Sequence, residues 1–303
     1  MSLHLPGSRR SFLQTAVGVG AIAIAGRSSV ALDSQGDESY VFFSDTHICG
    51  DKTKIVSDAN MFANLSRAID EVLALPQLPR ALFVNGDCAY LKGLAEDYAT
   101  FASEIRRVSQ AGIDLHMTMG NHDDRGPFAN ALSEHARQSP VQGKHVSIIE
   151  GQHVNWFLID SLQIVDNVTG EIGNAQRKWL AEALDRHSDK PAIVMGHHNP
   201  QYLPEGSSER VTGLADTAEL VDVFHAHANV KAYIYGHTHH WKMTETAGKV
   251  HLVNLPPTAY VFNKTMPNGW VHAKVDGSSL SMTMHAFDDQ HPAHLGEHRL
   301  AFR

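Results

Sequence analysis

The chain has 303 residues, of which 43% are hydrophobic and 19% are charged, and this composition excludes a disordered or fibrous protein and allows one or two domains. Its 33 acidic and 25 basic residues give a net charge of −8, which is the wrong sign for non-specific binding to a nucleic-acid backbone. The unusual feature is the number of histidines, 21. Because histidine is the commonest metal ligand, this number favours a metal site.

The first 31 residues have the pattern of an export signal. Arg9 and Arg10 precede a short apolar run over 16–25, and small residues allow cleavage after Ala31, with Ala25 as the alternative. The run is shorter than the roughly 20 apolar residues that span a bilayer. The paired arginines resemble a twin-arginine (Tat) signal, which implies the Tat machinery as a partner and a periplasmic or secreted location. Cleavage would leave 22 basic and 33 acidic residues, a net charge of −11.

Strands and helices are predicted to alternate along the rest of the chain. Apolar runs predict strands over 39–44, 81–84, 114–119, 146–149, 155–159, 192–195 and 232–235. Helical spacing predicts helices over 58–75, 95–111, 127–138, 174–187 and 217–226, the last opened by a capping box of Asp216 and Glu219. The end of the chain is mostly strand, over 250–254, 270–275 and 280–285. This order predicts an α/β protein with helices layered on a mixed sheet or a pair of sheets.

Five short polar clusters directly follow predicted strands. They are Asp45-Thr46-His47, Gly86-Asp87, Gly120-Asn121-His122-Asp123, Gly196-His197-His198 and Gly236-His237-Thr238-His239. Loops at the carboxyl ends of strands in an open α/β sheet converge on one crevice, so we expect these side chains to meet. Asp45 and His47, two apart on an extended segment, would point to the same side and chelate one ion. Aspartate, asparagine and histidine donors without a thiolate suit a borderline-to-hard divalent or trivalent ion.

Each cluster alone is ordinary turn or surface chemistry, but their conjunction points to a family. The ordered motifs D-x-H, G-D, G-N-H-D, G-H and G-H-T-H resemble the calcineurin-like metallophosphoesterases over roughly residues 40–285. The resemblance implies an α/β fold, a four-layer α/β/β/α sandwich of two mixed β-sheets flanked by helices. It places the domain at 39–287, after the signal peptide at 1–31 and before a C-terminal tail at 288–303.

The resemblance also implies a role for each motif residue. Asp45, His47, Asp87 and His239 would hold a first metal ion, and Asp87, as the bridge, would hold a second with Asn121, His197 and His237. The two ions, Mn²⁺, Fe²⁺/Fe³⁺ or Zn²⁺, would lower the pKa of a shared water, and the resulting metal-bridging hydroxide would attack phosphorus. His122 would contact the phosphoryl or leaving-group oxygen as electrostatic partner or general acid, and Asp123 would orient its imidazole.

Two positions depart from the family pattern and leave alternatives open. His198 rivals His197 as the ligand, because both histidines follow the same strand. Tyr90 completes a Gly-Asp-x-x-Tyr pattern that is similar to the purple acid phosphatases, in which a tyrosinate binds iron. Those enzymes lack the histidine of the first motif, whereas His47 is present in this chain.

Other residues near the motifs also have two interpretations. Cys49 and Cys88 would either form one disulfide in an oxidising exterior or serve as small buried fillers. Arg125 would either steer a phosphate or lie solvated in its loop, and the same holds for Tyr202 and Arg210.

The expected activity is hydrolysis of a small phosphodiester or phosphomonoester. A mature charge of −11 disfavours long polyanions, so no nucleic-acid partner is expected, and no stable membrane association is expected either. Cyclic nucleotides and glycerophosphodiesters both fit. The alternatives are a purple-acid-phosphatase-like monoesterase and a non-catalytic metal-binding protein on the same fold.

Overall fold

The computed structural model describes residues 37–135, 139–204 and 206–303. The predicted export signal over 1–31 lies outside the described residues, as do the last residues of the helix predicted over 127–138. None of the helices in the described ranges is long and apolar enough to cross a membrane.

The secondary structure follows the predicted order. The strands are β1 (Glu38–Phe43), β2 (Ile55–Val56), β3 (Ala59–Asn60), β4 (Ala81–Asn85), β5 (Asp114–Thr118), β6 (Ser147–Glu150), β7 (Asn155–Leu158), β8 (Ala192–Met195), β9 (Val230–Tyr235), β10 (Lys242–Glu245), β11 (His251–Asn254), β12 (Gly269–Val275), β13 (Ser279–Ala286) and β14 (Glu297–Ala301). The helices are α1 (Met61–Leu73), α2 (Ala95–Gln110), α3 (Arg125–Ala131), α4 (Asn174–Arg186) and α5 (Thr217–Ala226). Helix α3 ends earlier than predicted. Strands β2, β3, β10 and β14 were not predicted, because they are short or carry polar, exposed residues.

The strands form two six-stranded sheets and a separate pair, β2 with β3. The first sheet has the order β14-β13-β12-β1-β4-β5, and the second has the order β10-β11-β9-β8-β7-β6. Strands β1, β4 and β5 run parallel in the first sheet, as do β7, β8 and β9 in the second. The other pairings are antiparallel, apart from β11 with β9, so both sheets are mixed.

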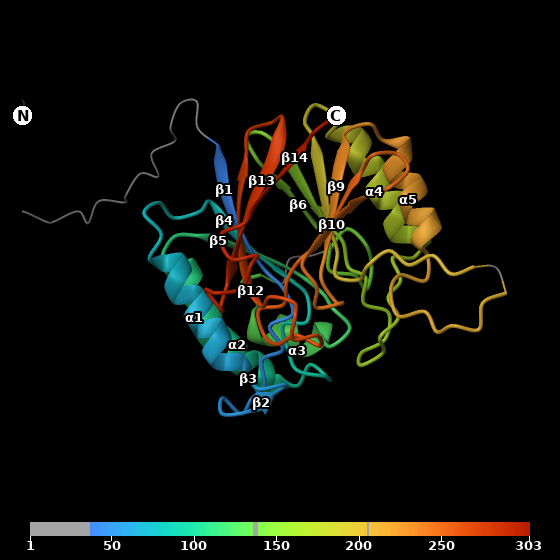
Figure 1. Ribbon diagram of the computed structural model, residues 1–303. Helices are drawn as coiled ribbons and strands as arrows, with labels where there is room; N and C mark the ends of the chain where they lie inside the picture. Colours follow the sequence, from blue (N-terminus) through green and yellow to red (C-terminus); the bar gives the residue numbers. More distant parts are fainter. Residues whose placement is uncertain (1–36, 136–138, 205) are drawn as a thin grey trace, which may run out of the picture. The chain divides into compact units, whose positions relative to one another are not determined.

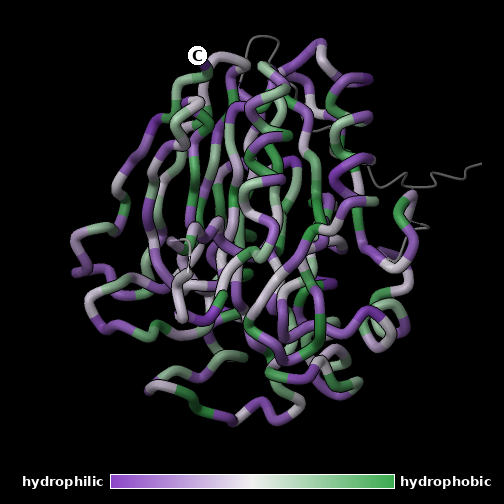
Figure 2. Tube along the Cα trace, turned by 90° about the vertical axis from the view of Figure 1, so that its right-hand side faces the viewer, coloured by the Kyte–Doolittle hydropathy of each residue, from purple (hydrophilic) through white to green (hydrophobic). Residues whose placement is uncertain are grey.

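The two sheets pack face to face, and helices cover their outer faces. Between the sheets, the ring of Trp156 on β7 contacts Phe42 on β1 and Phe83 on β4, with centroids 5.6 and 4.8 Å apart. Helices α1 and α2 cover the first sheet and α4 and α5 the second, on opposite sides of the paired sheets (Figure 1). Figure 2 shows hydrophobic residues concentrated along the strands between them. The predicted four-layer α/β/β/α sandwich is confirmed.

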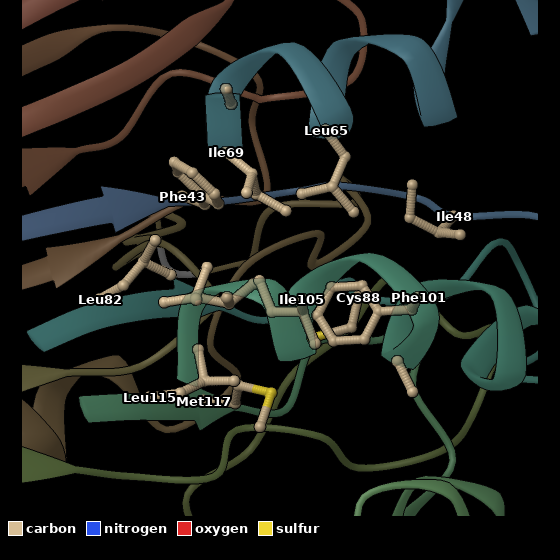
Figure 3. Packing of buried hydrophobic residues seen from close by; sticks show 14 of the residues in the cluster. Phe43, Ile48, Leu65, Ile69, Leu82, Cys88, Phe101, Ile105, Leu115 and Met117 are labelled. Carbon is tan, nitrogen blue, oxygen red and sulfur yellow. The ribbon is translucent and has the colours of Figure 1, made fainter. Parts of the chain in front are cut away.

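The amphipathic spacing of α1 shows how the outer layers form. Its residues Met61, Leu65, Ala68, Ile69 and Val72 recur three or four apart and are buried, and the Asn60 side chain caps the helix by accepting the N–H of residue 63. Figure 3 shows the side chains of Leu65 and Ile69 directed from α1 towards the strand that carries Phe43. This packing fixes α1 against the outer face of the first sheet and leaves the ends of the strands free for the loops that follow them.

The capping box predicted at the start of α5 is wrong, although the helix begins where predicted. Asp216 occupies the N-cap position without a side-chain capping bond. Its carboxylate instead accepts the N–H groups of Ile172 and Gly173 and pairs with Arg177. The carboxylate therefore ties α5 to α4 and to the loop before α4 rather than closing its own helix.

Residues 297–301 of the expected C-terminal tail over 288–303 form an edge strand of the first sheet. Strand β14 pairs with β13 in antiparallel register, with Leu300 opposite Leu280. Leu300 is buried and Phe302 packs on the core between the sheets. The sequence pattern concealed this strand because four of its five residues are exposed.

Candidate metal centre

All five polar motifs lie directly after parallel strands of the two sheets. The residues of the first three follow β1, β4 and β5 of the first sheet, and those of the last two follow β8 and β9 of the second. The predicted convergence at the carboxyl ends of strands therefore occurs, and it draws on both sheets.

Asp45, His47 and His239 form a first cluster of buried donor atoms. The Nε2 atoms of His47 and His239 are 3.0 Å apart, and Asp45 Oδ1 lies 3.4 Å from His239 Nε2 and 4.0 Å from His47 Nε2. One ligand atom from each residue lies within 4.8 Å of the others, close enough for all three to bind one ion. One carboxylate and two imidazoles within this distance can together bind a metal ion.

Asp87, His197 and His237 form a second cluster that adjoins the first. Asp87 Oδ2 lies 3.3 Å from His197 Nε2 and 3.8 Å from His47 Nε2, so this carboxylate stands between the two clusters. His197 Nε2 is also 3.8 Å from Asp45 Oδ1. The position of Asp87 is the one that a bridging carboxylate would need.

Of the two rival histidines, the structure brings His197 into the cluster. His198 is equally buried, but its Nδ1 is hydrogen-bonded to Ser161 Oγ at 2.7 Å, and its ring lies against that of His237 at 4.5 Å between centroids. Asn121 is buried, and its amide oxygen has no partner within the described residues. Its two chain neighbours adjoin Asp87, since the His122 N–H donates to Asp87 Oδ1 and Gly120 packs against the same carboxylate.

The structure changes the role expected for Asp123. Its carboxylate accepts hydrogen bonds from the N–H groups of residues 88, 89 and 120 and from the Tyr98 hydroxyl, at 2.9 to 3.3 Å. The His122 imidazole instead donates from Nδ1 to Leu91 O at 2.7 Å, and Asp166 Oδ1 lies 3.5 Å from the same nitrogen. Asp123 therefore fixes the backbone of the motifs, and Leu91 and Asp166 are the groups that face the His122 ring.

Backbone carbonyls hold three further imidazoles. His197 donates from Nδ1 to Asn85 O at 2.8 Å, and His239 donates from Nδ1 to Tyr260 O at 2.6 Å. His237 donates from Nε2 to the carbonyl of residue 212, also at 2.6 Å. In each ring this fixes the tautomer and leaves the other nitrogen to the cluster, the arrangement that orients metal-bound histidines.

The loops adopt an unusual backbone conformation at the candidate ligands. The φ angles of Asp45, His47, Asp87, His237 and His239 lie between 46° and 68°, in the left-handed region that residues other than glycine rarely adopt. The interpretation of Asp45 and His47 as neighbours on an extended segment is therefore wrong, because both have left-handed backbone in the loop after β1. Such strain persists only where surrounding contacts impose it, and it is typical of functional sites.

Two motif glycines permit close approach to the carboxylates. A Cβ at Gly120 would overlap Asp87 Oδ1 and the backbone nitrogen of Asp87, and a Cβ at Gly236 would overlap the side chains of Ser44 and Asp45. Neither glycine has a positive φ angle. Their function is therefore to leave space for the neighbouring side chains, rather than to supply a left-handed backbone.

The electrostatics of the two clusters fit metal ions. Burial lowers the pKa of His47 to about 3 and that of His237 to about 4, so both imidazoles are neutral at pH 7 and offer a lone pair. Burial also opposes charge on His197, but Asp87 and Asp45 outweigh it and raise the His197 pKa to about 10. A cation between these carboxylates would replace that proton. The buried Asn121 Oδ1 has no hydrogen-bond partner within the described ranges and is a further donor that a metal would satisfy.

Other residues singled out in the sequence lie outside both clusters. Tyr90 lines a separate cavity of about 350 Å³ and lies under the ammonium of Lys54, 5.0 Å from the ring centre. Cys49 and Cys88 are free thiols, not a disulfide. Arg125 makes a two-pronged ion pair with the buried Asp160, with both bonds 2.7 Å long, so it is neither a solvated loop residue nor a free phosphate ligand.

The loop over 255–268 contributes aromatic residues that the motifs did not indicate. The Tyr260 ring stacks on His47 with centroids 5.2 Å apart, and the Phe262 ring stacks on His239 at 4.1 Å. No short motif marks these positions, since their approach depends on where the loop returns to the sheet.

Comparison with known proteins agrees with this geometry. The family model of the calcineurin-like phosphoesterases matches residues 39–241. The chain is 26% identical over 264 residues to a cAMP/cGMP dual specificity phosphodiesterase of Mycobacterium tuberculosis. This match covers 84% of the present chain and 77% of that phosphodiesterase. It is 22% identical over 218 residues to a glycerophosphodiester phosphodiesterase of Enterobacter lignolyticus, with 72% and 76% covered.

A solved structure shows the same fold. The structure of a dimetal phosphatase from Danio rerio is similar with a TM-score of 0.67 at 10% identity, and the match covers 88% of this chain and 100% of that one. The family match extends over most of the chain and includes all five motifs. This protein therefore belongs to the calcineurin-like phosphoesterases, a family of metal-dependent phosphoesterases.

Proposed function

We propose that this protein is an exported phosphodiesterase that uses two metal ions to hydrolyse a small phosphodiester. The observation that carries the proposal is the pair of adjoining donor clusters that meet at Asp87, with His122 beside them and partly open to solvent. The relatives named as phosphodiesterases of cyclic nucleotides and of glycerophosphodiesters support a diester as the substrate.

The residues present fit two metal positions. The first would be held by Asp45, His47, His239 and Asp87, and the second by Asp87, Asn121, His197 and His237. When bound there, two divalent ions would lower the pKa of a water molecule and offset the negative charge of the phosphoryl group. The donor set of carboxylates, imidazoles and an amide suits Mn²⁺, iron or Zn²⁺.

His122 is the residue best placed to act on the leaving group. Its Nδ1 donates to Leu91 O, so Nε2 is the nitrogen that can carry a proton to a leaving oxygen. When both nitrogens are protonated, Asp166 can balance the charge of the ring, because its Oδ1 lies 3.5 Å from Nδ1. The N–H of His122 also donates to Asp87 Oδ1 at 2.8 Å, which couples the position of His122 to the carboxylate between the two clusters.

Export by the Tat route to the periplasm or the exterior is part of the proposal. It is supported by the paired arginines, the short apolar run and the small residues before Ala31. Replacing Arg9 and Arg10 together by lysine should retain the protein in the cytoplasm. Fractionation of cells that express either form tests this, and an unchanged distribution would contradict it.

The activity is tested with the manganese-loaded protein on bis-p-nitrophenyl phosphate and p-nitrophenyl phosphate in parallel. We expect diester turnover that Asp87→Ala abolishes together with both metals, because both clusters lose a ligand. His122→Ala should keep the metals and lower kcat by about 10²–10⁴-fold. His225→Ala is the matched control, since His225 is exposed, bonds to Thr246 and belongs to neither cluster.

The two variants separate the possible failures. Loss of metal in His122→Ala would show that His122 is a structural part of the metal site, contrary to its assignment as the group that acts on the leaving oxygen. Turnover of the monoester alone would identify a phosphatase. Diester turnover that survives in Asp87→Ala would place the chemistry elsewhere.

A further inference from the structure

The loop over 255–268, between β11 and β12, closes one side of the metal centre. Its residues Thr258 and Ala259 donate backbone N–H bonds to Ser44 O and Asp45 O, at 2.7 and 3.1 Å. Its Tyr260 carbonyl accepts the Nδ1 proton of His239. The loop is therefore held against the segments that carry two candidate ligands.

Phe262 is the most exposed large hydrophobic residue in the part of the chain that the structure describes. Its side chain is 68% exposed, yet its ring is nearly parallel to that of His239, with 16° between the planes and 4.1 Å between the centroids. Tyr260 meets the Phe262 ring edge-on at 5.9 Å. One face of Phe262 is thus covered by a candidate metal ligand, and the other face is open.

We propose that Phe262 determines substrate specificity, by stacking a planar ring of the substrate, of the nucleobase class, on its open face while the phosphate lies at the metal centre. This inference rests on the proposed function. An exposed apolar ring is unfavourable in water, and covering it with a flat ring recovers apolar contact and stacking energy.

The geometry favours a ring over a flexible chain as the covering group. His239 and Tyr260 already fix the orientation of Phe262, so a stacked base loses little additional freedom when it binds. His239 belongs to the first cluster, and the Phe262 ring lies directly on its imidazole. Only that imidazole therefore separates Phe262 from the atoms that would hold the metal. A glycerol group attached to the same phosphate has no planar surface to place there.

The test compares two ligands that differ only by the base, AMP and ribose 5-phosphate. Their dissociation constants are measured by calorimetry on the manganese-loaded protein. We expect AMP to bind at least about fivefold more tightly than ribose 5-phosphate, the lower end of what base stacking on an aromatic ring contributes. Phe262→Ala and Phe262→Leu should bring this ratio close to one, and Phe262→Tyr should preserve it.

Two controls distinguish stacking from support of the metal site. Leu78→Ala removes an exposed apolar side chain before β4, at the opposite end of that strand from the centre, and should leave the ratio unchanged. Metal content is measured in every variant. If Phe262→Ala loses metal, or weakens both ligands equally, Phe262 only supports His239 and the inference is overturned.

Three further binding results would overturn the role proposed for Phe262. A wild-type ratio near one, a ratio that survives in Phe262→Ala, or no binding of either ligand each overturns the inference. Turnover of bis-p-nitrophenyl phosphate, assayed on the same samples, reports on the proposed function separately. A protein that cleaves the diester but does not prefer AMP would retain the proposed function and lose only the role of Phe262.

Discussion

Replacing Gly120 by alanine tests whether close backbone approach shapes the metal centre. A Cβ at this position would lie 2.8 Å from Asp87 Cγ and would overlap both Asp87 Oδ1 and the backbone nitrogen of Asp87. Rotation of the Asp87 side chain cannot relieve the overlap with the nitrogen, so the loop after β4 or the loop after β5 must move. Overpacking of this kind costs about 1–3 kcal/mol of unfolding free energy.

The displacement should also weaken metal binding, because Asp87 stands between the two clusters. Urea unfolding of the metal-free protein measures the stability cost. Repeating it at a fixed manganese concentration measures how much the metal stabilises each variant, since a ligand that binds only the folded state adds stability by mass action. We expect Gly120→Ala to lose stability without metal and to gain less than the wild type when manganese is added.

Gly126→Ala is the matched control, six residues further along. A Cβ there meets only Asp124 Oδ1 at 3.4 Å, and Gly126 lies within α3 without a positive φ angle. Because Pro127 follows and disfavours a helical backbone at a residue with a Cβ, alanine gains no helix stability here, but it should leave the metal stoichiometry unchanged and cost less than Gly120→Ala. The reasoning fails if Gly120→Ala matches the wild type in unfolding free energy and in metal stoichiometry, or if Gly126→Ala is equally costly.

Two further predictions concern ion pairs away from the metal centre. Arg125→Ala should lower the unfolding free energy by about 3 kcal/mol, because it removes the guanidinium that pairs with both carboxylate oxygens of the fully buried Asp160. Lys264→Ala should leave the urea midpoint unchanged, because its ion pair with Asp58 is exposed on both sides. Burial raises the pKa of Glu38, but two backbone N–H groups and Arg80 outweigh it and hold this pKa below its usual 4.5. The stability from this depressed pKa is complete above pH 4.5 and is lost as the pH falls through the folded value. Glu38→Gln should therefore reduce the loss of unfolding free energy between neutral and acidic pH, measured by urea titrations at each pH. An unchanged dependence of the unfolding free energy on pH would contradict this.

The sequence was sufficient to predict the layers and the place of the site, because both depend on local patterns. Buried strands such as β4 and β8 are continuous apolar runs, and the motifs follow them immediately. Strand β14 was missed because its exposed, polar residues carry no such pattern. The pairing of Arg125 with Asp160 was missed because it joins residues 35 apart whose contact depends on the tertiary fold.

The hydrogen-bond partners of the functional side chains could not be predicted from the sequence either, for a different reason. The groups that fix His122, His197 and His239 are backbone carbonyls, and every residue has one. No residue type marks which carbonyl will face an imidazole. The same limit applies to Asp123, whose carboxylate is occupied by backbone N–H groups and Tyr98 rather than by the neighbouring imidazole.

The left-handed backbone at the candidate ligands links the fold to the site. Each such residue costs about 1 kcal/mol or more, and long-range hydrogen bonds hold the strained segments. Asp45 N donates to the carbonyl of residue 86, His47 N donates to Asp87 O, and His237 N donates to Asp45 Oδ1 at 3.1 Å. The last bond crosses from the second sheet to the first. The ligand geometry therefore exists only when both sheets are packed, and a metal that binds this geometry stabilises the contact between the sheets as well as its own loops.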